Sequence, residues 1–407
     1  MNHEQAIVYL DSFTKSGKPV TDLSRFAGLM SALGDPQKNI RFVHVAGTNG
    51  KGSVCEYISQ GLINSGLTVG KFTSPYINFL EERIQLNNVP VSKEVFAELM
   101  TQVKAAADST GCRDYSQFEL LTAAAFLYYR DCDIAVIETG IGGTLDCTNI
   151  IDPVLSVITT VDLDHCAILG NTPAQIAAHK AGIIKPNRPA VTAPLQYEEV
   201  LEVLRERAER VSAELIVPKN EELQVLSVTP EGTGFCYKNE NFHTKMCGEH
   251  QAVNAVAAIE ALRLLGVSEG NIRFGLETAA VPARMERLGD WVIDGAHNLS
   301  GARAVAGFLS AQEGRKLLVT GMLASKDWQG SLDMLLPLFD EVIAVDFFAQ
   351  DAVPAERIEA LCGKHGKHCV KAGSALEAVK LAESLQDDLK IVCGSLYLCG
   401  RMREVLY

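Results

Sequence analysis

Short apolar runs alternate along the first part of the chain with stretches whose apolar residues recur every three or four positions. The apolar runs have the length of buried strands and cover residues 40–46, 134–137, 154–160 and 189–193. The stretches with helical spacing cover residues 55–65, 92–107, 119–130, 172–184 and 198–213. This alternation over residues 1–283 predicts an α/β domain built on a mainly parallel sheet.

Residues 223–246 interrupt the alternation with short period-two runs, which predict a hairpin or small antiparallel sheet. A helix is expected over 251–265, and it ends at Gly266. A second α/β series follows, with strands at 291–294, 316–320, 342–346 and 390–393 and helices at 300–312, 330–339, 355–365 and 375–385. We therefore predict an N-terminal domain over residues 1–283 and a smaller, Rossmann-like C-terminal domain over 284–407.

Composition limits the class of protein. The chain has 407 residues, more than the ~250–300 at which single cores stop growing, which agrees with two domains. A net charge of −13 argues against a nucleic-acid surface, and no apolar run reaches the ~18 residues of a membrane span. The first residues do not resemble a signal peptide, and the eleven cysteines form no C-x-x-C pair, so we expect a cytoplasmic protein with reduced thiols.

The turn after the first predicted strand carries the most specific motif. Residues 44–54 read His-Val-Ala-Gly-Thr-Asn-Gly-Lys-Gly-Ser-Val and lead into a predicted helix. Glycines have no Cβ, so backbone N–H groups at such a turn can approach an anion. Lys51 can neutralise phosphate charge and Ser53 can offer its hydroxyl to Mg²⁺, so the motif predicts a phosphate cradle of a P-loop ATPase.

The spacing of this motif departs from that of the general P-loop. Gly47 lies only three residues before Gly50, and Gly52 separates Lys51 from Ser53. A glycine-rich loop without a ligand is therefore the alternative interpretation. The order of strand, glycine turn and helix favours phosphate binding.

Polar residues also close several other apolar runs. Ser74 follows a short run, Glu138 closes the second strand, and Asp162, Asp164 and His165 follow the third. The carboxyl ends of parallel strands are where α/β sheets bind ligands, and hard oxygens with an imidazole suit Mg²⁺ near phosphates. Each residue alone is compatible with a turn or a helix cap. Their register with the glycine turn favours a shared site.

Three other polar segments have simple structural interpretations as well as functional ones. Lys180, near the end of a predicted helix, can be a solvated lysine that favours the helix dipole. Asp294 begins a polar turn after a strand of the second domain, where Asn298 could cap the next helix. Lys326 follows the next strand, where it could reach a phosphate or carboxylate or pair with Asp327.

Many segments, in one order, resemble the folylpolyglutamate synthase family, which is often bifunctional with dihydrofolate synthase and belongs to the superfamily of Mur-type amide ligases. The resemblance runs nearly end to end and rests on segments 44–54, 72–75, 82–84, 138–149, 163–165, 180–183, 248–254, 282–286, 294–298, 321–327 and 394–397. It implies a ligase that uses ATP and Mg²⁺ to convert a folate carboxylate into an acyl phosphate. The amine of L-glutamate then attacks the acyl phosphate and forms an amide.

The resemblance also implies roles for individual residues. Those expected to hold the nucleotide are Gly47, Thr48, Asn49, Gly50, Lys51, Gly52, Ser53, Asn254, Arg284, Asp294 and His297. Ser74 and Glu138 would bind one Mg²⁺, and His165 a second. Lys180 lies fifteen residues after His165, matching the lysine that such ligases carry as a carbamate. Lys51, His165 and Lys180 are thus the catalytic candidates, and the resemblance replaces the solvated-lysine interpretation.

The acceptor stays open, because the chain departs from the family near the expected substrate. Tyr76 stands where the family commonly has His, and Thr144 where it commonly has Arg. Substrate contacts are expected from these two residues and from Arg83, Lys326 and Ser395. Dihydropteroate, a reduced folate or both remain candidate acceptors.

Two other functions remain as alternatives. One is a sister ligase that joins an amino acid to a cell-wall precursor, and the other is an ATP-binding regulator without turnover. In each case the expected partners are small molecules, with no nucleic acid or membrane, and the resemblance implies a monomer.

Overall fold

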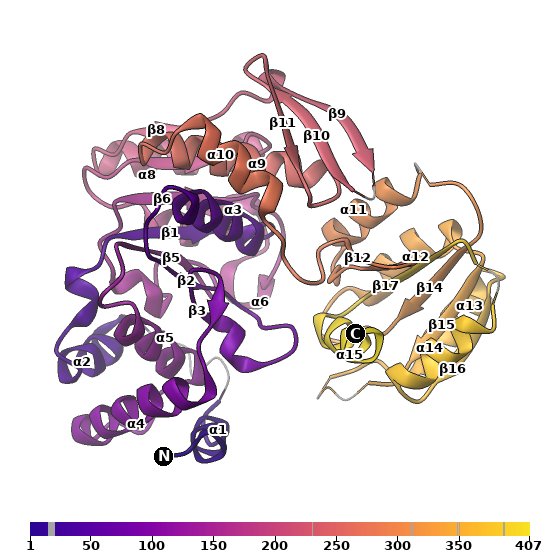
Figure 1. Cartoon of the computed structure of the whole chain (residues 1–407), viewed down its shortest axis with the longest axis horizontal. Helices are drawn as coiled ribbons and strands as arrows, with labels where there is room; N and C mark the ends of the chain where they lie inside the picture. The colour runs from indigo at the N-terminus through magenta and orange to yellow at the C-terminus, as the bar shows by residue number, and fades with distance from the viewer. Residues whose placement is uncertain (15–20, 230, 311, 348, 350, 386) are drawn as a thin grey trace.

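An eight-stranded sheet forms the frame of the N-terminal part in the computed structural model (Figure 1). Its strands are β1 (Phe42–Ala46), β2 (Val69–Phe72), β3 (Ile84–Leu86), β4 (Val89–Pro90), β5 (Ile134–Glu138), β6 (Leu155–Ile158), β7 (Ala190–Thr192) and β8 (Leu215–Ile216). They lie in the order β4-β3-β2-β5-β1-β6-β7-β8, and only β3 and β4 run antiparallel to their neighbours. The predicted mainly parallel sheet is confirmed. The structure describes the whole chain except residues 15–20, 230, 311, 348, 350 and 386.

Helices cover both faces of this sheet, because its central strands are apolar on both sides. In β1 all residues are buried; Phe42 packs into one core, and Val43 and Val45 pack into the opposite one. The helices are α1 (His3–Asp11), α2 (Ser24–Ala32), α3 (Lys51–Asn64), α4 (Lys93–Thr110), α5 (Gln117–Tyr128), α6 (Cys166–Leu169), α7 (Pro173–Lys180), α8 (Glu198–Arg210), α9 (Glu249–Leu264) and α10 (Glu269–Thr278). Helices α1, α2, α4 and α5 contribute to the Phe42 side, and α3, α9 and α10 to the other.

A small antiparallel sheet stands beside α9, as the sequence predicts. It consists of β9 (Leu223–Thr229), β10 (Gly232–Tyr237) and β11 (Glu240–Thr244), in the order β11-β10-β9. Phe235 and Phe242 stack with ring centroids 5.6 Å apart and are buried in the same core as α9. Figure 1 shows this sheet at the top of the molecule, between the two larger units.

The C-terminal part contains a second sheet with the order β12-β13-β17-β14-β15-β16. Its strands are β12 (Glu286–Leu288), β13 (Trp291–Ile293), β14 (Lys316–Thr320), β15 (Glu341–Val345), β16 (His368–Ala372) and β17 (Leu389–Cys393). Its helices are α11 (Leu299–Ser310), α12 (Trp328–Leu335), α13 (Ala355–Lys364), α14 (Ala375–Glu383) and α15 (Leu396–Leu406). The smaller α/β unit is therefore confirmed. The boundary between residues 283 and 284 lies in the connection from α10 to β12 and stays a prediction.

Some predicted elements differ from those observed. The helix predicted over residues 172–184 stops at Lys180 and continues as a 3₁₀ turn, Ala181–Ile183. There a Cβ at Gly182 would lie 2.1 Å from Oγ1 of Thr144, so this turn packs directly on a neighbouring loop. The edge strands β12 and β16 were not predicted, because they are partly exposed and carry charged residues among the apolar ones.

Two further observations concern the whole chain. All eleven cysteines are free thiols. Among the residues that the structure describes, no helix combines the length and the apolar character needed to cross a bilayer.

The contact between α3 and α10 generates a stability prediction. A Cβ at Gly275 would lie 2.9 Å from the backbone N and Cα of Gly61 in α3. Gly275→Ala should therefore force the two helices apart and lower the free energy of unfolding by about 1–3 kcal/mol, measured by urea denaturation. Gly270→Ala is the matched control, because the same helix has nothing within 4 Å of that position. It should leave stability equal or raise it by up to about 1 kcal/mol, and equal losses in both variants would contradict this account.

Candidate active site

The turn between β1 and α3 is packed so tightly that it has no room for a side chain at Gly47 or Gly50. A Cβ at Gly47 would lie 1.7 Å from Oγ1 of Thr159, and one at Gly50 would lie 2.1 Å from Oδ1 of Asn254. Gly50 also has a φ of +84°, which residues with a Cβ rarely adopt. No described side chain caps the amino end of α3, so its first N–H groups are left for an anion.

The residues inside the turn fasten it to the neighbouring strand end. The N–H groups of Thr48 and Asn49 both donate to the carbonyl oxygen of Thr160, at 2.9 and 3.3 Å. The Thr48 hydroxyl donates to the carbonyl of Asp162 at 2.9 Å and accepts from its N–H at 3.0 Å. These amides are therefore used within the protein, and the free donors belong to the residues that begin α3.

Three residues predicted from different segments converge beside this turn. The Ser74 N–H donates to Oε2 of Glu138 at 3.0 Å, and Nζ of Lys51 lies 3.7 Å from Oε1 of the same carboxylate. Glu138 is only 3 % exposed, and burial raises its pKa against the opposing effects of Lys51 and the Ser74 N–H. The carboxylate and the serine hydroxyl are hard oxygen donors of the kind that Mg²⁺ prefers.

Ser74 and Glu138 do not form a complete metal site by themselves. Among the described residues, no three His, Cys, Asp or Glu side chains come close enough together to hold a metal ion. The chemistry of Ser74 and Glu138 therefore fits Mg²⁺ only if phosphate oxygens supply further ligands. Among the described residues, His165 therefore belongs to no such group of three.

Lys180 is buried rather than solvated, which contradicts the simplest interpretation of the sequence. It is 4 % exposed, and its Nζ donates to the carbonyl oxygen of Gly47 at 2.7 Å. Burial, followed by the nearby charge of Lys51, lowers its pKa to about 7. A substantial fraction of this amine is therefore neutral, and hence nucleophilic, at physiological pH.

Thr144 holds the end of the helix that carries Lys180. Its N–H and its hydroxyl both donate to the carbonyl oxygen of His179, at 2.8 and 3.0 Å. Thr144 is not among the described residues that line the cavities below. The structure therefore places this predicted substrate residue beside Lys180.

Asp164 joins the two domains next to His165. Its Oδ1 accepts from Nζ of Lys326 and from the N–H of His165, both at 2.8 Å. Burial alone would raise the Asp164 pKa, but Lys326 lowers it to about 2. The predicted alternative pairing of Lys326 with Asp327 is not observed, because Asp327 caps α12 by accepting from the N–H of Gly330.

The second domain also contributes a buried acid and a neutral imidazole. Asp294 accepts two backbone N–H groups at 2.8 Å, and burial raises its pKa while Arg284 lowers it. His297 has Nδ1 2.8 Å from the carbonyl oxygen of Gly295, so Nδ1 carries the hydrogen. Burial lowers the His297 pKa to about 4, which leaves Nε2 available as an acceptor near neutral pH.

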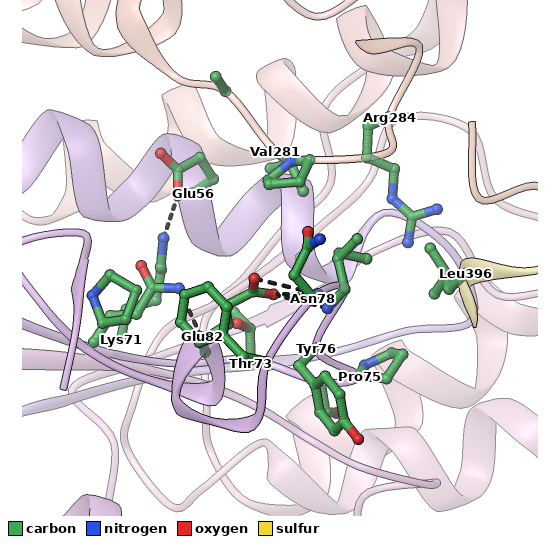
Figure 2. Close-up of a pocket in the computed structure, with 18 of the residues that line it drawn as sticks. Glu56, Lys71, Thr73, Pro75, Tyr76, Asn78, Glu82, Val281, Arg284 and Leu396 are labelled. Carbon is green, nitrogen blue, oxygen red and sulfur yellow. Dashed lines mark hydrogen bonds and ion pairs between the residues drawn. The ribbon is translucent and has the colours of Figure 1, made fainter. Parts of the chain in front are cut away.

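Two cavities meet at residues 74–76 and bring half of the predicted residues together. The interdomain cavity measures about 720 Å³, and its predicted lining residues are Ser74, Tyr76, Arg83, His165, His297, Lys326 and Ser395. The linker cavity measures about 680 Å³, and its predicted lining residues are Gly52, Ser74, Tyr76, Glu138 and Arg284. In Figure 2, Val281 and Arg284 lie on one side of the linker cavity and Pro75 and Tyr76 on the other.

Arg83 is a partly buried cation at the wall of the interdomain cavity. Its guanidinium lies 5.4 Å from the ring centroid of Tyr76, and burial lowers its pKa. Its Nε is buried without a hydrogen-bond partner among the described residues. A guanidinium in this state can bind an incoming carboxylate, because desolvation has already occurred and a donor is free.

The remaining lining residues show what the sequence analysis missed. Phe118 and Asp146 both line the interdomain cavity. Asp146 accepts from the N–H groups of Gly140 and Ile141 at 2.9 and 3.0 Å and thus shapes the loop after β5. Its position in a Gly-rich segment could have indicated this role, whereas Phe118 is an ordinary apolar position of a helix. Ser395 is buried, and its hydroxyl accepts from the Tyr397 N–H as the cap of α15.

Comparisons with known proteins agree with this geometry. A family model described as the Mur ligase middle domain matches residues 45–262, and one described as the dihydrofolate synthetase C-terminal domain matches residues 278–405. The chain is 35 % identical to dihydrofolate synthase/folylpolyglutamate synthase of Bacillus subtilis, with 94 % of each chain covered. A structure of Mycobacterium tuberculosis folylpolyglutamate synthase with ADP and AMPPCP matches at a TM-score of 0.89 and 30 % identity, covering 99 % of this chain and 98 % of that one. Escherichia coli FolC in complex with DHPP and ADP matches at 0.88 and 27 %, covering 100 % and 98 %.

The packing of the glycine turn predicts the effect of one methyl group. Gly50→Ala should weaken binding of a Mg²⁺–nucleotide by at least about tenfold in calorimetric titration, because its Cβ would displace Asn254 and strain the turn. Gly66→Ala is the matched control, since Gly66 has a similar φ of +85° but nothing within 4 Å. It should lose some stability and keep its affinity. Equal affinity in both variants would show that the turn does not bind the nucleotide.

Proposed function

The chain belongs to the folylpolyglutamate synthase/dihydrofolate synthase family of Mur-type ligases. We therefore propose that the site formed by the glycine turn and the two cavities catalyses the joining of L-glutamate to a folate-type carboxylate. The protein is an ATP-dependent ligase that forms carbon–nitrogen bonds. The observation that carries the proposal is the convergence of Lys51, Ser74 and Glu138 beside the glycine turn, with buried Lys180 behind it.

The nucleotide phosphates belong at the amino end of α3. The N–H groups of Gly50, Gly52 and Ser53 and the Lys51 ammonium would offset the charge of the β- and γ-phosphates. Asn254 lies against Gly50 of the turn. Arg284 lies in the connection from α10 to β12, and Asp294 directly follows β13; the base and ribose would bind beside these two residues. Mg²⁺ bound at Ser74 and Glu138 would withdraw electron density from the phosphate oxygens.

The acceptor carboxylate would bind beside Arg83, a cation that lines the interdomain cavity. An oxygen of this carboxylate attacks the γ-phosphorus, the bond to the β-phosphate oxygen breaks, and ADP leaves. The glutamate amine, in its neutral form, then attacks the acyl carbon. It loses a proton to a base as inorganic phosphate leaves, so an amide results. Ser395 and His297 line the same cavity from the second domain, where Ser395 would contact glutamate and His297 the nucleotide.

The acceptor identity is tested directly by product formation. Wild-type protein with Mg-ATP and L-glutamate should release ADP when dihydropteroate, tetrahydrofolate or both are added, and the product mass should increase by one glutamate. The E. coli relative was solved with DHPP, which makes dihydropteroate the first acceptor to assay. A reaction without acceptor is the control. A folded, nucleotide-binding protein that is inactive with both acceptors would contradict the proposal.

We also propose that Lys180 reacts with CO₂ to form a carbamate. Its pKa of about 7 supplies the neutral amine that this reaction requires, and carbamylation leaves one N–H for the bond to Gly47. The product is an anion, which could orient a second Mg²⁺ together with His165. An ammonium could not do so because of its charge.

If Lys180 carries a carbamate, the wild-type protein should show a carbamate resonance, and replacing the lysine should lower kcat. After incubation with ¹³C-labelled CO₂, the wild-type protein should show a carbamate ¹³C resonance that Lys180→Met lacks. At fixed CO₂ pressure the resonance should grow as the pH rises through about 7, because the neutral amine increases. Lys180→Met should also lower kcat by about a hundredfold or more while nucleotide binding persists.

Lys185→Met is the matched control for Lys180. Lys185 lies on the same segment and donates to the Asn149 carbonyl oxygen at 2.9 Å, away from the glycine turn. This variant should keep the resonance and most of the activity. A wild-type rate in Lys180→Met, or a resonance that survives in it, would overturn the carbamate.

A further inference from the structure

Asp164 contacts residues of both domains at the site. One of its oxygens, Oδ1, accepts from the Lys326 ammonium and from the backbone N–H of His165, each at 2.8 Å. The other, Oδ2, lies 3.8 Å from Nε2 of His165. One carboxylate therefore binds the backbone of His165 and a cation from the other domain, and its second oxygen lies near the His165 ring.

The backbone at His165 needs this support. His165 has a φ of +50°, in the left-handed region that non-glycine residues adopt uncommonly. It is the residue before α6, a helix of one turn, and its own side chain makes no cap. The hydrogen bond from its N–H to Asp164 is thus a local restraint on the backbone that carries the imidazole, and His165 lines the interdomain cavity.

The ion pair across the domains is shielded from solvent. The side chains of Asp164 and Lys326 are 18 % and 19 % exposed, so their attraction is less screened than that of a surface pair. Lys326 lies in the loop between β14 and α12, 162 residues from Asp164 in the chain. The pair can form only when the two domains are close together.

We propose that Asp164 is a positioning residue that couples approach of the C-terminal domain, through Lys326, to the orientation of His165. When Lys326 arrives, the carboxylate is drawn into one position and His165 is fixed in the cavity. When the domains separate, Asp164 loses its cation and the His165 segment loosens. This inference rests on the proposed ligase function, because His165 acts there beside the phosphates.

A double-mutant cycle on ligation tests the coupling. Asp164→Asn and Lys326→Met should each lower kcat by about tenfold or more, with the KM for ATP changed less than about threefold. The double variant should be no slower than the worse single variant, because both changes break one linkage. Lys326→Arg keeps the charge and should recover part of the rate. Lys371→Met removes a lysine that pairs with Glu356 within the second domain, and it should leave kcat unchanged.

Hydrogen exchange gives a readout that does not depend on turnover. In the intact protein, Lys326→Met should speed amide exchange over residues 162–170 of the N-terminal domain, and Lys371→Met should not. Independent, multiplicative losses of kcat, or unchanged exchange in Lys326→Met, would overturn the coupling. If wild-type protein fails to ligate but exchange responds as stated, the proposed function fails and the link between Lys326 and the His165 segment stands.

Discussion

The tight packing of the turn between β1 and α3 is the constraint on which the rest of the site depends. Thr159 at the end of β6 and Asn254 in α9 lie where side chains of Gly47 and Gly50 would be. These contacts restrict the backbone conformation of the turn. In this conformation the first N–H groups of α3 lie at the edge of the sheet. The same conformation puts the Gly47 carbonyl oxygen within 2.7 Å of Lys180, so the anion cradle and the reactive lysine are built by one piece of backbone.

The site concentrates positive charge in an acidic protein. The net charge is −13, yet Lys51, Arg83, Arg284 and Lys326 all lie around the two cavities or the turn. Lys51 and Lys326 each lie near one carboxylate, whereas Arg83 and Arg284 form no ion pair among the described residues, and burial lowers the pKa of Arg83. Uncompensated cations in a dry site bind phosphate and carboxylate groups strongly. A reaction between an anionic nucleotide and an anionic acceptor needs this arrangement.

Features formed by residues that are neighbours in the chain could be predicted from the sequence. Contacts between segments that are far apart in the chain could not. Strand, glycine turn and helix at residues 40–65 are contiguous, so the cradle could be located, and Ser74 and Glu138 follow from the rule on strand ends. The burial of Lys180 depends on loops remote from it in the sequence, so its position near a helix end alone suggested a solvated side chain. Asp164 and Lys326 are 162 residues apart, and no local pattern marks either as the partner of the other. Edge strands such as β16 were missed because solvent exposure removes their apolar signal.

Transfer of oxygen from the acceptor to phosphate tests the central claim most directly. In the proposed mechanism the acceptor carboxylate is phosphorylated at this site. If so, an acceptor labelled with ¹⁸O in that carboxylate should yield inorganic phosphate with one ¹⁸O atom for each amide formed. The label in the phosphate is measured by mass spectrometry. The bond between acyl carbon and bridging oxygen breaks when the amine attacks, so the label must leave with the phosphate. Phosphate without label, at a normal rate of amide formation, would contradict an acyl phosphate and with it the roles assigned to this site.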